Sequence, residues 1–350
     1  MRPTRTNIIA LAFGAALCSA CGDGPTQPSA ANYQYTNVPA PAGGVAQFTF
    51  LPVTMAAGQS VTALGNLNPP GHVLPTDHIY FYDGDLAGNQ PFGSDVRDVL
   101  MPATGAVVFI IRPGGTDYKI MFRATENFYF YLDHILLSQA LTVGQVLQAG
   151  TRIGTTAPGS AIDLGAFDFT VKHTGFVDTL RYSSQTVHYV APRSYFTPAL
   201  MAQVDAHLYR SASASDKGGQ IDFGIAGKLV GDWFLLGLPK DSSGGPYGWT
   251  RSMAFVYDYY DPAKVRISIG GTVAGPGVWG IDATAPRPET VTVASGIVSY
   301  KLYSPFDASF PPTGLLLVQM TDPSTIKVEY FAGSSASATQ FDASAVTFVR

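Results

Sequence analysis

The sequence predicts a mainly β protein with two β-rich regions joined by a helix. Runs rich in β-branched and aromatic residues recur along the chain, and Gly, Pro, Asn and Asp punctuate them. Aromatic residues make up 12% of the chain and charged residues only 13%, against roughly 25% charged residues in an average soluble protein. One segment shows clear helical periodicity. A chain of 350 residues is long enough for two domains.

The amino-terminal residues 1–21 have the organisation of a bacterial lipoprotein signal. Arg2 and Arg5 precede the apolar run NIIALAFGAAL, which is too short to span a bilayer as a helix. Two small residues directly precede Cys21, and this order resembles signals in which that cysteine is lipidated. We therefore expect Cys21 to anchor the protein to a membrane of the cell envelope. The alternative is an ordinary secretory signal, which would release a secreted protein.

Both cysteines lie in this signal, so the lipoprotein interpretation leaves the folded part without a thiol. Residues 22–45 are rich in Pro, Gly, Ala and Ser and are predicted to form a flexible tether. The formal net charge is −4, and Lys and Arg form no cluster. Because phosphate binding needs a basic footprint, we expect no nucleic-acid partner.

The first β domain is predicted over residues 46–180, with RPGGTDY as a hairpin turn. A linking helix is predicted within 194–212, where Thr197 can cap the N-terminus and Pro198 suits the first helical position. Leu200, Val204 and Leu208 recur every four residues and predict its buried face.

A second β domain is predicted over residues 218–350, because closely spaced strand-like runs follow one another to the end of the chain. This pattern indicates an antiparallel sandwich or barrel. Trp233, in GDWF, follows a glycine at the start of a strand. This short stretch resembles the opening strand of a lipocalin-like barrel, in which the tryptophan closes the base.

Five segments between about residues 70 and 170 carry a family resemblance. In order they are PTDHIYFY, VLMPATGAVVFI, TDYKIMFRATENFYFYLDHI, LTVGQVLQAGTRIGTT and AIDLGAFDF. Together they resemble the lysostaphin/LytM-type zinc endopeptidases, which cleave peptide cross-links in bacterial cell walls. The fourth segment is the most specific, although it marks the scaffold rather than the chemistry. The resemblance implies the duplicated-hybrid-motif β fold for residues 46–180.

The resemblance also implies candidate site residues. His78 falls on the first zinc ligand, and His134 falls on the histidine that stabilises the oxyanion. Tyr82 falls on the family's aspartate ligand, and the adjacent Asp83 would need a bulge to replace it. The final His-x-His motif falls on Asp163-Leu164-Gly165, so both histidines are missing in that register. A shift of two residues would place Asp163 on the metal-binding position.

A catalytic zinc takes three protein ligands and an activated water, with a general base beside that water. Because the motif departs from the family at two of the three ligands, we expect His78 to be the relic of a metal site. No cofactor is then expected, and zinc is expected only if His78 and Asp163 still hold it. His72, in PPGHVLP, is expected to be a water-exposed turn histidine.

Three hypotheses for function follow. The leading one is a non-catalytic envelope lipoprotein that binds cell-wall peptide or glycan, or an envelope protein. The second is an active zinc metallopeptidase in which His78 and Asp163 bind the metal and His134 stabilises the oxyanion. The third is a small-molecule carrier whose C-terminal β domain forms the pocket.

Overall fold

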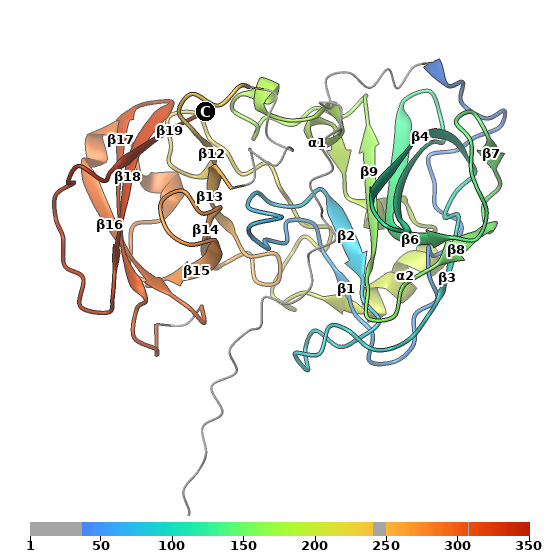
Figure 1. The fold of residues 1–350 in the computed structure, drawn as a ribbon, viewed down its shortest axis with the longest axis horizontal. Helices are drawn as coiled ribbons and strands as arrows, with labels where there is room; N and C mark the ends of the chain where they lie inside the picture. Colours follow the sequence, from blue (N-terminus) through green and yellow to red (C-terminus); the bar gives the residue numbers. More distant parts are fainter. Residues whose placement is uncertain (1–36, 241–249, 307) are drawn as a thin grey trace, which may run out of the picture.

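The computed structural model describes residues 37–240, 250–306 and 308–350. The predicted signal with Cys21 and the first part of the predicted tether lie outside the described residues. The chain forms two β bodies, the first coloured blue to yellow-green and the second yellow to red (Figure 1). The prediction of a mainly β fold is confirmed. Within the described ranges, no helix has the length and apolar character needed to cross a membrane.

Among the described residues, the first body is built on an eleven-stranded sheet, in which eight strands follow the order β11-β1-β2-β9-β6-β5-β4-β7. Strand β10 pairs with β9, and β8 pairs with β3 and β6. The strands are β1 (Val61–Thr62), β2 (His78–Phe81), β3 (Asp98–Leu100), β4 (Gly105–Gly114), β5 (Asp117–Arg123), β6 (Phe128–Leu137), β7 (Val146–Leu147), β8 (Arg152–Thr155), β9 (Ile162–Asp168), β10 (Tyr189–Val190) and β11 (Leu208–Tyr209). The predicted hairpin at RPGGTDY is confirmed, since β4 and β5 pair antiparallel and Gly114 lies opposite Asp117.

Alternation along the central strands separates an apolar face from a polar one. On β9, Leu164 points into the main core, and so does Phe130 on β6. Their neighbours Tyr129, Tyr131 and Phe167 form a separate buried cluster on the opposite face. The polar residues of the candidate site lie on this second face, beside that aromatic cluster.

The predicted linking helix is shorter than the sequence suggested. Helix α2 spans Pro198–Ala206, and a short helix α1 (Ser184–Val187) precedes it. Thr197 occupies the cap position of α2, but its side chain makes no capping hydrogen bond. Val204 is buried as predicted, whereas Leu208 lies outside the helix in β11, which pairs in parallel with β1. The helix therefore returns the chain to the first sheet before the second body begins.

The second body is a closed antiparallel barrel of eight strands, which decides between the predicted sandwich and barrel. The ring closes between its first and last strands, with Phe234 opposite Val349. The strands are β12 (Gly231–Leu235), β13 (Ser252–Tyr257), β14 (Val265–Ile269), β15 (Gly277–Ile281), β16 (Ile297–Tyr303), β17 (Gly314–Asp322), β18 (Thr325–Ala332) and β19 (Val346–Val349).

Trp233 is fully buried in the barrel, and its indole N–H donates to the Leu229 carbonyl at 2.8 Å. The guanidinium of Arg350 lies 4.0 Å from the centre of the indole ring. Further inside, a continuous cluster of buried apolar side chains that includes Phe255, Tyr300 and Phe348 fills the barrel.

Candidate functional site

The structure brings the three predicted site residues together on the polar face of the first sheet. The Nε2 atom of His78 lies 3.3 Å from Oδ2 of Asp163, and the Nε2 atom of His134 lies 3.5 Å from the same oxygen. Asp163 is therefore the central carboxylate of a cluster that we call the His-Asp cluster. It comprises Asp77, His78, Asp117, Lys119, Tyr131, Asp133, His134 and Asp163.

Strand register explains the convergence of residues that are far apart in sequence. His78 on β2 lies opposite Gly165 on β9, and Tyr131 on β6 lies opposite the same glycine. Asp133 and Asp163 lie directly opposite each other across β6 and β9. Two carboxylates in such a pair repel each other unless positive groups lie close by. Lys119 and His134 supply those groups.

Both histidines are oriented by a second carboxylate. His78 Nδ1 lies 3.3 Å from Oδ1 of Asp77, and His134 Nδ1 lies 3.0 Å from Oδ2 of Asp117. Each imidazole thus bridges two aspartates, and Asp163 is shared. Such carboxylate–histidine pairs fix the orientation of a ring and determine which nitrogen faces the centre.

Both carboxylate oxygens of Asp77 accept hydrogen bonds from neighbouring side chains. Its Oδ1 accepts a hydrogen bond from the Tyr131 hydroxyl at 2.6 Å. Its Oδ2 accepts bonds from Gln185 and Thr186 on α1, each at 3.0 Å. Burial alone would raise the pKa of Asp77, but the bond to His78 and the charges of His78 and Lys119 hold it below its ordinary value. Asp77 is therefore an ionised positioning group.

Lys119 places an ammonium group inside the cluster. Its Nζ lies 3.5 Å from Oδ2 of Asp133 and 4.0 Å from the centre of the Tyr131 ring. Burial opposes its charge, yet Asp133, Asp77 and Asp163 together raise the pKa of Lys119 above its ordinary value. The chain thus supplies its own permanent cation to this group of carboxylates.

His134 occupies a strained backbone position. Its φ is +68°, a left-handed conformation that non-glycine residues rarely adopt. Its N–H donates to the Asp133 side chain at 2.9 Å, and the register of β5 against β6 shifts beside it. Although burial lowers the pKa of His134, Asp163, Asp117 and Asp133 raise it to about 10. His134 is therefore an imidazolium at neutral pH.

Tyr131 seals the cluster above Gly165. A Cβ atom added at Gly165 would fall within the Tyr131 ring, so the phenol occupies the space that any side chain at position 165 would need. The Tyr131 hydroxyl also lies 2.9 Å from His78 Nδ1. Tyr131 itself is only 1% exposed.

One expectation needs correction. His72 is not a water-exposed turn histidine, because its ring is partly buried 5.3 Å from that of His78. Burial and the charges of His78 and Lys119 lower its pKa to about 3. Tyr82 stacks on Tyr80, and Asp83 accepts a hydrogen bond from the Gly93 N–H, which agrees with the expectation that Asp83 could replace the family's aspartate only through a bulge.

Sequence reasoning missed Asp77, Asp117, Lys119, Tyr131 and Asp133. Asp77 immediately precedes His78, which was one available signal. The spacing of Tyr131 and Asp133 was another, since residues two apart on a strand share a face. The position of Lys119 required the tertiary pairing of β5 with β6.

The donor atoms can be tested against a zinc ion. Two imidazole nitrogens and one carboxylate oxygen form a suitable donor set, and His78 Nε2 and Asp163 Oδ1 are buried with no hydrogen-bond partner among the described residues. A catalytic zinc, however, keeps a position open to water and substrate. The side chains of His78 and Asp163 are only 7% and 4% exposed. The arrangement fits a closed ionic cluster better than a catalytic zinc site.

No family model matches the chain, and no curated protein sequence matches it. Solved structures that align with it include a catalytic-domain mutant of the prophage-encoded M23 protein EnpA from Enterococcus faecalis, at 14% identity over 41% of this chain and 95% of that chain, with a TM-score of 0.26. The catalytic domain of lysostaphin from Staphylococcus simulans aligns at 14% identity over 36% and 82%, with a TM-score of 0.23. A zinc-containing peptidase from Vibrio cholerae aligns at 13% identity over 35% and 36%, with a TM-score of 0.25. This likeness is distant, so the function is argued from the geometry of the cluster.

Proposed function

We propose that the protein is an envelope lipoprotein whose first domain binds cell-wall material without cleaving it. The observation that carries this proposal is the burial of His78 and Asp163, whose side chains are only 7% and 4% exposed. The Tyr131 ring adds to this closure, because its hydroxyl donates a hydrogen bond to Asp77 and lies 2.9 Å from His78 Nδ1, the ring nitrogen that does not face Asp163.

The cations that the chain itself places in the cluster support the same proposal. Four aspartates meet in the cluster, and Lys119 and protonated His134 supply two positive charges without any metal. Binding a metal through His134 would first require removal of its proton. We infer that the cluster stabilises the sheet beside a wall-binding surface and performs no hydrolysis.

A zinc metallopeptidase is the second candidate, favoured by one specific observation. Both histidines direct Nε2 towards Asp163, and both have Nδ1 held by an aspartate. In this candidate His78 and Asp163 would hold zinc and His134 would stabilise the oxyanion. The carrier hypothesis has less support, because apolar side chains fill the barrel.

Co-sedimentation with purified bacterial wall material separates these candidates. We expect the protein to sediment with the wall equally well with and without a metal chelator, and to release no soluble peptide fragments. An Asp163→Asn variant that remains folded should sediment as the wild type does. Fragment release that stops on chelation and in Asp163→Asn would establish the metallopeptidase instead. Failure of the folded wild type to sediment would contradict wall binding and leave an envelope protein as the partner to seek.

A further inference from the structure

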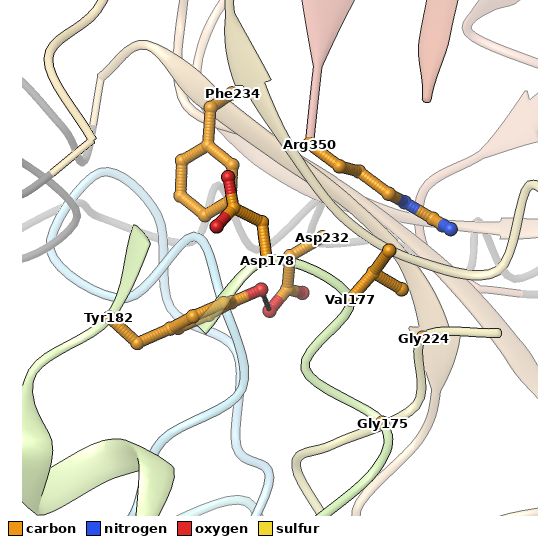
Figure 2. Close-up of a pocket in the computed structure, with 8 residues that line it drawn as sticks. All are labelled: Gly175, Val177, Asp178, Tyr182, Gly224, Asp232, Phe234 and Arg350. Atoms are coloured by element: carbon orange, nitrogen blue, oxygen red, sulfur yellow. Dashed lines mark hydrogen bonds between the residues drawn. The ribbon is translucent and has the colours of Figure 1, made fainter. Parts of the chain in front are cut away.

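The two domains meet at a polar seam outside the His-Asp cluster. A loop of the first domain that contains Asp178 and Tyr182 faces β12 and the carboxyl-terminal Arg350 of the barrel across a small pocket (Figure 2). The Tyr182 hydroxyl donates to Oδ2 of Asp232 at 2.9 Å. This bond joins the two domains directly.

Asp232 is poorly solvated as an anion. It is only 7% exposed, and its second oxygen, Oδ1, is buried with no hydrogen-bond partner among the described residues. A buried carboxylate with a single hydrogen bond is costly, whereas the neutral acid loses much less on burial. The geometry therefore favours the protonated form of Asp232 while the seam is closed.

The guanidinium of Arg350, whose charge acts on Asp232, spends its hydrogen bonds elsewhere. The terminal nitrogens of Arg350 donate to the carbonyls of Ile225, Leu229 and Val230. Burial raises the pKa of Asp232 to about 7, although the Tyr182 bond and the charge of Arg350 lower it.

The other charged groups at the seam are already paired. Asp178 lies 2.9 Å from Lys240 and 3.8 Å from Arg181. Asp222 adds negative charge near Asp232. Its carboxylate accepts a hydrogen bond from the Tyr189 hydroxyl at 2.6 Å and lies 3.5 Å from His173. None of these groups places a hydrogen bond on Oδ1 of Asp232 within the described part of the chain.

We propose that this seam is a pH-sensitive latch, closed when Asp232 is protonated and bonded to Tyr182, and loosened when Asp232 ionises. Opening the seam would expose Asp232 to water, where the carboxylate is stable. The latch would thus couple external pH to the relative freedom of the wall-binding domain and the barrel.

The sign of the effect follows from linkage. The closed state raises the pKa of Asp232 from 3.8 to about 7, so it binds the proton more tightly than the open state does. The resulting stabilisation is complete below 3.8 and is lost as pH rises through about 7. Between these values the opening equilibrium constant should increase by up to about tenfold per pH unit.

Amide hydrogen exchange can measure this opening. The Gly224 N–H donates to the Gly175 carbonyl across the seam at 2.9 Å, so its protection reports the closed state. After correction for the intrinsic exchange rate, we expect its opening constant to increase steeply between about pH 4.5 and 6 and to level off above about 7. Burial lowers the pKa of His173, but Asp222 raises it above its ordinary 6.5, so any contribution of His173 begins above the window of about pH 4.5 to 6.

Three variants make the test specific. Asp232→Asn should abolish the pH slope, because the amide keeps an acceptor for Tyr182 but carries no titrating proton. Asp178→Asn, on the same seam, should keep the slope, since asparagine also caps the following turn. Tyr182→Phe should extend the slope to higher pH, because it removes a bond that lowers the pKa of Asp232 in the closed state. A flat profile in the wild type, or an unchanged slope in Asp232→Asn, would overturn the latch. If Asp232→Asn fails to fold, the pH profiles of the wild type and of Tyr182→Phe still test the latch.

Discussion

Gly165→Ala is expected to destabilise the first domain by about 3 kcal/mol, because the new methyl group would overlap the Tyr131 ring. The ring has little freedom to move away, since its hydroxyl is held by Asp77 at 2.6 Å and lies 2.9 Å from His78. Chemical denaturation monitored by circular dichroism would measure the loss.

A double-mutant cycle locates the cause. Tyr131→Ala should be destabilising on its own, by about 3–5 kcal/mol. In that background, however, the added cost of Gly165→Ala should largely disappear, because the clash has been removed. Gly275→Ala is a matched control, since a Cβ atom there meets no atom within 4 Å. If Gly165→Ala is as stable as Gly275→Ala, Tyr131 does not seal the cluster.

Lys119→Met is expected to cost about 3 kcal/mol at pH 7, because it leaves Asp133 beside Asp163 without its cation. The side chains of Lys119 and Asp133 keep 21% and 16% of their surface exposed, which places the cost at the lower end of the range for breaking a buried pair. The thioether chain of methionine retains most of the packing against Tyr131.

The destabilisation caused by Lys119→Met should depend on pH. Burial raises the pKa of Asp133, but Lys119 and His134 hold it below its ordinary value, so the pair stabilises the fold above that value and less as pH falls. The penalty of Lys119→Met should therefore shrink as pH falls towards the ordinary value of 3.8, because in the variant, without Lys119, burial favours the protonation of Asp133. Asp133→Asn added to Lys119→Met should restore most of the stability at pH 7. A penalty that is independent of pH and not rescued would mean that Lys119 acts through packing alone.

The sequence was sufficient for the regular parts of the fold. Strand-like runs predicted both β domains, and Gly-rich RPGGTDY predicted a hairpin because such residues favour tight turns. The predicted helix extended too far at its carboxyl end, because Leu208 continues the helical spacing of the sequence but lies in β11, where it pairs with β1. Tertiary pairing prevailed there over local periodicity.

The candidate site was predictable only in part. His78, His134 and Asp163 were identified through a resemblance, and the structure places Nε2 of each histidine within 3.5 Å of the Asp163 carboxylate. Strict alternation would put either Asp133 or His134 on the polar face, but not both. The left-handed backbone at His134 allows both to reach the cluster, and nothing in the local sequence marks that conformation. Likewise, only strand register reveals that Tyr131 fills the space beside Gly165.

The most direct test of the proposed closed, non-catalytic cluster is the zinc content of the purified protein, measured beside His78→Ala and Asp163→Ala after exposure to zinc and dialysis. We predict far less than one zinc per chain in the wild type and no difference in either variant. About one zinc per folded wild-type chain, lost in both variants, would contradict the proposal and identify the cluster as a metal site.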